Sequence, residues 1–191
     1  MFSRNAGQNY KKCGKVYLFP REKRPGVVRA VKFRIFVQNS IALRTVELLA
    51  PARDYASAVV AVDAGADAVM ILPPYYFHFG TEALLQYYDR LAAQIHGNIY
   101  IYNFPDNTGY TIPPQTVLAL AKIHSNIVGM KDTISGMDHT RELIKVVKSQ
   151  IPSFEIYSGF DDNFAHNVLA GGNGCIGALS NVVPEVCSAW V

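Results

Sequence analysis

A lysine at the end of an apolar segment is the clearest candidate for chemistry in this 191-residue chain. Lys131 directly follows residues 126–130, NIVGM, which have the composition of a short buried strand. Such a lysine either extends its ammonium group to water or stays among apolar walls, where loss of hydration disfavours the charged form. A neutral amine attacks ketones and forms a Schiff base, whose iminium acts as an electron sink for a neighbouring carbon. Lys131 is therefore a candidate covalent catalyst.

Tyr102 is the second candidate, because it lies near the end of the apolar segment that precedes that of Lys131. If the two segments are neighbouring strands, the side chains can converge, and a phenol can pass a proton to the carbinolamine that precedes a Schiff base. The alternative is a half-buried ring whose hydroxyl faces water. Thr133, two residues after Lys131, offers a hydroxyl that could bind a substrate hydroxyl or cap a turn.

The elements that must position these residues alternate regularly from Gly65 onward. Apolar segments bounded by turn residues predict strands, and segments with helical spacing predict helices. The expected strands are 66–72, 98–104, 126–131, 154–159 and 174–179. The expected helices are 81–96, with Thr81 as its cap, 113–123, 137–148, 161–170 and a last one from Pro184.

The pattern before Gly65 is less regular. Residues 33–37, FRIFV, favour a strand, because they are rich in β-branched and aromatic side chains. Residues 41–64 indicate a helix that breaks or restarts at Pro51, since an interior proline removes a backbone hydrogen bond.

Apolar strands that alternate with helices indicate a parallel sheet covered on both faces. An open doubly wound sheet and a (β/α)8 barrel both fit, but no GxGxxG motif follows the first strand, which weakens the dinucleotide-binding version of the former. Polar residues follow five consecutive strands, and in a barrel these positions meet at the C-terminal face, where barrel enzymes carry their chemistry. They are Tyr75 and Tyr76, Tyr102 and Asn103, Lys131 to Thr133, Gly159 with Asp161 and Asp162, and Ser180 with Asn181.

Several motifs together resemble the dihydrodipicolinate synthase/N-acetylneuraminate lyase superfamily in order and spacing. They are PPYYF (73–77), IYNFPDNTG (101–109), NIVGMKDT (126–133) and YSGFDDNF (157–164) with GGNGCIGALSN (171–181). The resemblance covers about residues 53–191, with a weaker match from Phe33. It implies a (β/α)8 TIM barrel and a pyruvate-dependent class I aldolase, which needs no metal and no cofactor and acts on pyruvate and an aldehyde.

The resemblance also implies residue roles. Lys131 matches the Schiff-base lysine, and Tyr102 matches the acid/base tyrosine, whose hydroxyl lies near the bound pyruvate carboxylate. Tyr76 matches a tyrosine that reaches into a neighbouring subunit's site in some members, so we expect a homo-oligomer. The predicted substrate-binding residues are Thr133, Gly159, Asp161, Asp162, Ile176 and Asn107.

The N-terminal part departs from the family pattern. The family's second strand ends in a Gly-Thr/Ser-rich loop that binds the pyruvate carboxylate and completes the proton relay, and residues 1–40 contain no such loop. Nor does the chain continue past Val191 to the family's C-terminal helices. We therefore expect a divergent basic segment at 1–31 and a partial barrel at 32–191, with its first two strands divergent or missing and its C-terminal helices absent. An incomplete barrel exposes unpaired strand edges, which favours association with another chain.

Charge and composition limit the kinds of binding partner and the cellular compartment that the chain can have. Residues 1–44 hold eleven Lys/Arg and one acid, whereas residues 45–191 hold seven Lys/Arg and fourteen acids. The basic segment could bind nucleic acid, act as a targeting segment, or be foreign to the domain that follows; its poor amphipathic pattern and lack of a recognised binding module favour the last. Three cysteines and five scattered histidines without metal-ligand spacing predict free thiols in a reducing, cytoplasmic compartment and no metal site. The chain contains no apolar run of about 18 residues, so the sequence predicts no membrane span.

Within the resemblance, the acceptor substrate decides the activity. Dihydrodipicolinate synthases place an arginine two residues after the proline of the Tyr-Asn-x-Pro motif, where it pairs with the acceptor's carboxylate; here Asn107 stands there and supplies no cation. We therefore expect reversible cleavage of a 2-oxo-3-deoxy sugar acid to pyruvate and an aldehyde. The alternatives are dihydrodipicolinate synthase activity, N-acetylneuraminate lyase activity, for which Ala178 replaces a frequent pocket serine, and a catalytically inactive truncated family member.

Overall fold

Six strands form one parallel sheet in the computed structural model, which describes residues 49–52, 54–75 and 77–189. The strands lie side by side in chain order. A doubly wound sheet reverses its strand order at a switch point, whereas unbroken chain order belongs to a sheet that winds in one direction, as in a barrel. The expected incomplete (β/α)8 barrel is confirmed, with six strands among the described residues. They are β1 (Leu49–Ala52), β2 (Ala68–Ile71), β3 (Asn98–Asn103), β4 (Ile127–Asp132), β5 (Glu155–Ser158) and β6 (Gly174–Cys175).

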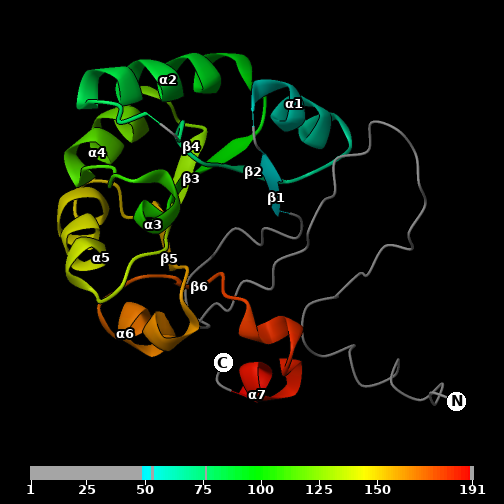
Figure 1. Cartoon of the computed structure of the whole chain (residues 1–191), viewed down its shortest axis with the longest axis vertical. Helices are drawn as coiled ribbons and strands as arrows, with labels where there is room; N and C mark the ends of the chain where they lie inside the picture. Colours follow the sequence, from blue (N-terminus) through cyan, green and yellow to red (C-terminus); the bar gives the residue numbers. More distant parts are fainter. Residues whose placement is uncertain (1–48, 53, 76, 190–191) are drawn as a thin grey trace, which may run out of the picture.

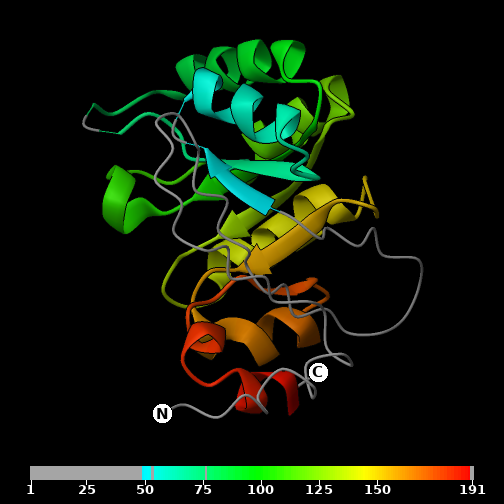
Figure 2. The same ribbon diagram turned by 90° about the vertical axis from the view of Figure 1, so that its right-hand side faces the viewer.

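The helices between the strands lie on one side of the curved sheet. In Figure 1, α1, α2, α4, α5 and α6 form an arc outside the strands, and Figure 2 shows the same helices from the side. The α-helices are α1 (Tyr55–Asp63), α2 (Thr81–Gln94), α3 (Pro105–Thr108), α4 (Pro114–Ile123), α5 (Asp138–Leu143), α6 (Phe164–Leu169) and α7 (Pro184–Ala189). A π-helical turn, η2 (Ile144–Lys148), extends α5, and the 3-10 turns η3 (Asp161–Asn163) and η4 (Leu179–Asn181) follow β5 and β6.

Alternation along the strands separates two apolar clusters. Side chains such as Val69, Ile101 and Ile156 pack outward against the helices in the larger cluster. Their neighbours face the inside of the curved sheet, because successive strand side chains point to opposite faces. The inner cluster consists of Ala68, Met70, Tyr100, Tyr157 and Ile176, with Tyr102 and Val128 packed against it.

A register shift between β3 and β4 sets which residues face inward near the strand ends. Ile99 pairs with Ile127, but Tyr100 pairs with Gly129, so β4 holds one extra residue, Val128, at this point. A side chain at Gly129 would overlap the Tyr100 ring, so the glycine makes room for the buried tyrosine. Beyond the shift, the pairing is regular up to the ends of both strands.

The helix expected over 41–64, with a break or restart at Pro51, is confirmed at Tyr55–Asp63 and wrong at Leu49–Ala52. Residues 49–52 form strand β1, and α1 begins only at Tyr55. Asp54 determines this start, because its side chain accepts a hydrogen bond from the Ser57 backbone N–H while the Ser57 hydroxyl oxygen accepts one from the Asp54 N–H. Pro51 is compatible with β1 because β1 is an edge strand among the described residues.

Several other details differ from the sequence-based expectations. The strand expected over 174–179 is a strand only at Gly174–Cys175. Thr81 does not cap α2; Gly80 occupies that position, and no side chain bonds there. The helix expected over 137–148 changes to π-helical turns at Ile144. The short helix α3 was not expected; Pro105 starts it, and Gly109, with a φ of 82°, ends it in the left-handed conformation that glycine favours. The strand expected at 33–37 and the segment 1–31 lie outside the described residues.

Candidate active site

Lys131 and Tyr102 come together at the C-terminal ends of β4 and β3. The register pairs Tyr102 with Lys131 and Lys131 with Tyr157, so the three residues form one row across three neighbouring strands. Lys131 is 6% exposed, and its Nζ lies 4.4 Å from the centre of the Tyr102 ring. The Lys131 side chain therefore does not extend to water. A cation over the face of an aromatic ring is attracted by the ring's quadrupole.

Aromatic side chains continue from Tyr102 along the same rim. The rings of Tyr102 and Phe104 are stacked, with centres 5.9 Å apart, and Phe104 meets Phe160 edge-on at 6.1 Å. Phe160 comes from the loop after β5, so this wall joins the β3 and β5 ends.

A buried carboxylate lies one row beneath Lys131. Glu155 Oε2 accepts hydrogen bonds from the hydroxyls of Tyr100 and Tyr157, the latter at 2.9 Å. Burial raises the pKa of Tyr157 well above its ordinary value, and the charge and hydrogen bond of Glu155 raise it further. Sequence reasoning missed this cluster, although the spacing of Glu155 and Tyr157 placed both on one face of a strand.

Thr133 and Gly159 lie against each other beside this row. Thr133 is buried, and its hydroxyl has no hydrogen-bond partner among the described residues. Its backbone N–H donates to the Asn103 carbonyl at 2.8 Å, and the Gly159 N–H donates to the Asp132 carbonyl at 2.9 Å. A side chain at Gly159 would overlap the Thr133 side chain, so Gly159 provides space rather than a binding group.

The other predicted substrate-binding residues lie in different settings. Asp161 accepts backbone hydrogen bonds from Ala178 at 2.9 Å and from Leu179 at 3.2 and 3.3 Å, so its carboxylate holds the loop after β6. Ile176 is fully buried in the inner cluster. Asp162 and Asn107 are exposed, in η3 and α3 respectively. Tyr76 lies outside the described residues.

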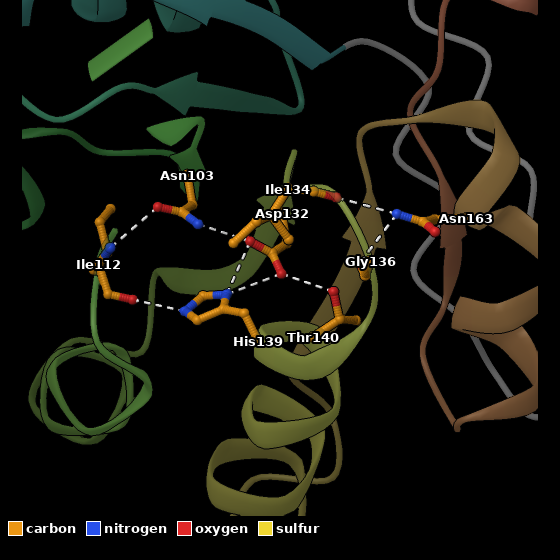
Figure 3. A network of polar contacts seen from close by, with 8 residues as sticks. All are labelled: Asn103, Ile112, Asp132, Ile134, Gly136, His139, Thr140 and Asn163. Carbon is orange, nitrogen blue, oxygen red and sulfur yellow. Dashed lines mark hydrogen bonds and ion pairs between the residues drawn. The ribbon is translucent and has the colours of Figure 1, made fainter. Parts of the chain in front are cut away.

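A polar network that sequence reasoning missed lies behind the row (Figure 3). The Asp132 carboxylate accepts hydrogen bonds from Asn103 Nδ2 at 2.8 Å and from the Thr140 hydroxyl at 2.7 Å, and His139 Nδ1 lies 2.9 and 3.0 Å from its two oxygens. His139 Nε2 contacts the Ile112 carbonyl oxygen at 3.0 Å, and the Ile112 N–H donates to Asn103 Oδ1 at 3.1 Å. We call Asn103, Ile112, Asp132, His139 and Thr140 the Asp132 network.

A second contact in the same view ties the loop after β4 to η3. Asn163 Nδ2 donates to the carbonyl oxygens of Ile134 and Gly136, at 3.1 and 3.2 Å (Figure 3). Asn163 thus holds the backbone after Thr133, and the Asp132 network holds the side chain of the residue before it. In the part of the chain that the structure describes, no group of three His, Cys, Asp or Glu side chains is arranged to hold a metal ion, and no helix is long and apolar enough to cross a membrane.

Comparison with known proteins identifies the family of this chain. The model of the dihydrodipicolinate synthetase family matches residues 54–191, which include every described residue of the row. The chain belongs to the dihydrodipicolinate synthetase family. Its family relatives include a probable 2-dehydro-3-deoxy-D-pentonate aldolase, YjhH, of Escherichia coli K12, which is 42% identical over 122 residues, 64% of this chain and 40% of the relative.

Two further family relatives are a named synthase and a protein of known crystal structure. The 4-hydroxy-tetrahydrodipicolinate synthase of Kosmotoga olearia is 41% identical over 125 residues, 65% of this chain and 42% of the relative. The crystal structure of YagE, a prophage protein of the dihydrodipicolinic acid synthase family from E. coli K12 in complex with pyruvate, superimposes with a TM-score of 0.68 at 36% identity, covering 71% of this chain and 47% of that one. The chain thus spans less than half the length of these relatives.

Proposed function

We propose that this chain carries the Schiff-base part of a class I, pyruvate-dependent aldolase site that cleaves a 2-oxo-3-deoxy sugar acid reversibly to pyruvate and an aldehyde. Lys131 forms the Schiff base, and Tyr102 moves the protons. The observation that carries the proposal is the buried Lys131 at the end of β4, with its Nζ 4.4 Å from the Tyr102 ring centre. The resemblance of the chain to sugar-acid aldolases supports the same chemistry.

The first step is formation of the Schiff base. The neutral Nζ of Lys131 attacks the C2 carbonyl carbon of the substrate, and Tyr102 gives a proton to the carbonyl oxygen. The attacking nitrogen then passes one of its protons to the new hydroxyl, which leaves as water, and a C=N bond forms with a positive nitrogen. The Tyr102 phenolate is then ready to accept a proton.

The second step is cleavage of the bond between C3 and C4. Its electron pair moves towards the positive nitrogen and gives an enamine, while the C4 hydroxyl loses its proton to Tyr102 and becomes the aldehyde. Tyr102 gives this proton to C3 of the enamine. Water then hydrolyses the iminium, the proton released returns to the Tyr102 phenolate, and pyruvate leaves as the neutral Lys131 is restored. Each step uses an amine, a phenol and water, without a redox change.

The properties of Thr133 and Asn107 favour the proposal that the substrate carries hydroxyl groups. The buried Thr133 hydroxyl, which has no partner among the described residues, can bond a substrate hydroxyl near the reacting carbons. Asn107 offers an amide and no cation to an acceptor's carboxylate. The synthase activity named for the Kosmotoga relative is the second candidate, and its test is the acceptor.

We also propose a homo-oligomer, because the exposed Tyr75 and Phe77 beside Tyr76 offer an apolar surface after β2. The free thiols of Cys175 and Cys187 support a cytoplasmic location.

The test is release of pyruvate from 2-keto-3-deoxygluconate or its five-carbon analogue by the full chain and by matched variants. Lys131→Arg should abolish release, because the guanidinium stays protonated and cannot attack a carbonyl. Tyr102→Phe should reduce it by about a hundredfold or more, the usual contribution of a positioned acid/base group. Lys145→Arg, at an exposed lysine of η2, is the control and should behave like the parent. Equal release by parent and Lys131→Arg would contradict the proposal.

A further inference from the structure

The Asp132 network joins four segments that are distant in sequence. Asn103 ends β3, Asp132 ends β4, His139 and Thr140 begin α5, and Ile112 precedes α4. The Ile112 N–H faces one end of the Asn103 amide, which must therefore be its oxygen, so the NH2 group is the end that donates to Asp132. Asp132 Oδ1 thus accepts from Asn103, and Oδ2 accepts from Thr140, so both carboxylate oxygens act as acceptors.

The contacts of His139 fix its protonation. Nδ1 faces the Asp132 carboxylate, and Nε2 faces the Ile112 carbonyl oxygen, and both partners only accept hydrogen bonds. A neutral imidazole has one N–H and can satisfy only one of them, whereas an imidazolium satisfies both. Burial by itself lowers the pKa of His139, but the hydrogen bond and charge of Asp132 and the Ile112 carbonyl outweigh it and raise the pKa above 6.5.

The network holds the backbone directly behind the candidate catalytic pair. Asn103 follows Tyr102, and Asp132 follows Lys131, and the register places each residue opposite its counterpart on the next strand. Since neighbouring residues of a strand point to opposite faces, the network lies on the helix side while Tyr102 and Lys131 face the interior. Movement of the two strand ends relative to each other would change the spacing of the pair.

We propose that Asp132 and a protonated His139 are positioning residues that hold Tyr102 and Lys131 at their reactive spacing, so that loss of the His139 proton slows Schiff-base formation. The proposal rests on the proposed function of Lys131. A neutral His139 gives up its bond to Asp132 or to Ile112, and the ends of β3 and β4 lose one of their cross-links. Asp132 is the one charged partner of His139 among the described residues; Asp138 and Arg141 on α5 pair with each other at the exposed surface, 3.7 Å apart.

The protonation state is tested directly by NMR of the histidine ring nitrogens in the full chain. His139 should titrate as an imidazolium with a pKa above 6.5, and it should lose this behaviour in Asp132→Asn. A His139 ring that is neutral with an ordinary or lowered pKa would overturn the proposal. The NMR titration does not depend on enzymatic activity, so it still tests the protonation of His139 if Lys131 proves unreactive.

The positioning role is tested by the rate at which pyruvate and borohydride label Lys131. The ratio of the parent rate to that of His139→Gln, taken at each pH, cancels the titration of the amine itself. The ratio should be about tenfold or more at low pH, in the range that misplaced catalytic groups cost, and should fall towards one as His139 loses its proton. A ratio that does not change with pH would overturn the positioning role.

Two variants serve as references. His166→Gln, at an exposed histidine of α6, should give a ratio near one at every pH. Thr140→Val removes one hydrogen-bond donor to Asp132 with little change of volume, and it should slow labelling at all pH values. This variant tests the role of the Asp132 network if His139→Gln folds poorly. Absence of labelling in the parent would contradict the proposed function and the positioning role together, while the NMR titration would still decide the ion pair.

Discussion

The side chain of Thr133 occupies the space in which a side chain at Gly159 would lie. Thr133 follows β4 and Gly159 follows β5, so this contact fits the two strand ends closely together beside Lys131. The Thr133 hydroxyl is buried without a partner among the described residues. An unpaired buried hydroxyl costs free energy, which a substrate hydroxyl would recover on binding.

Gly159→Ala should destabilise the fold, because the new methyl group overlaps Thr133 and its backbone. Overpacking of this kind costs about 1–3 kcal/mol of unfolding free energy, measurable by urea denaturation. Gly80→Ala, where a new methyl group would have no atom within 4 Å, is the matched control and should cost less. Equal losses in the two variants would contradict the close fit.

Glu155→Leu should be strongly destabilising. It leaves the buried hydroxyls of Tyr100 and Tyr157 without the acceptor that they share, at about 1–3 kcal/mol each. Glu155→Gln keeps an oxygen acceptor and should lose less, and urea denaturation compares the two. If Leu were tolerated as well as Gln, the hydrogen bonds would not be what stabilises the inner cluster.

The stability of the fold should depend on pH through His139. Its pKa is raised in the folded state, so its pairing with Asp132 stabilises fully below about pH 6.5 and is lost as pH rises through the folded-state pKa. The unfolding free energy of the parent should therefore exceed that of His139→Gln most at about pH 6 and least at about pH 9. A difference that grows with pH would have the wrong sign for this ion pair.

Asn107→Arg should shift the acceptor preference towards a carboxylate-bearing aldehyde. A new charge-assisted pair is worth about 1.5–3 kcal/mol, or roughly tenfold to a hundredfold in the rate with aspartate semialdehyde relative to the sugar acid. Coupled assays with both acceptors measure the ratio. Efficient use of aspartate semialdehyde by the parent chain would instead favour the synthase activity.

Most strands and helices after Gly65, the short helix α3 excepted, were predictable because apolar segments and turn residues alternate regularly. The meeting of Tyr102 and Lys131 followed from their places at the ends of successive strands. Strand β1 was missed because Leu49–Ala52 has no strand pattern and takes its form from pairing with β2. The Asp132 network was missed because its members come from four separate segments, and no spacing along the chain indicates their contact.

The central claim, that Lys131 is the reactive amine, is tested most directly by locating the label after treatment with pyruvate and borohydride. Peptide mapping by mass spectrometry of the full chain should show one reduced pyruvyl group, on Lys131, and none in Lys131→Arg. The reason is that Lys131 is buried beside Tyr102, whereas Lys122 and Lys145 are exposed. Label on another lysine, or folded protein with no label, would contradict the account.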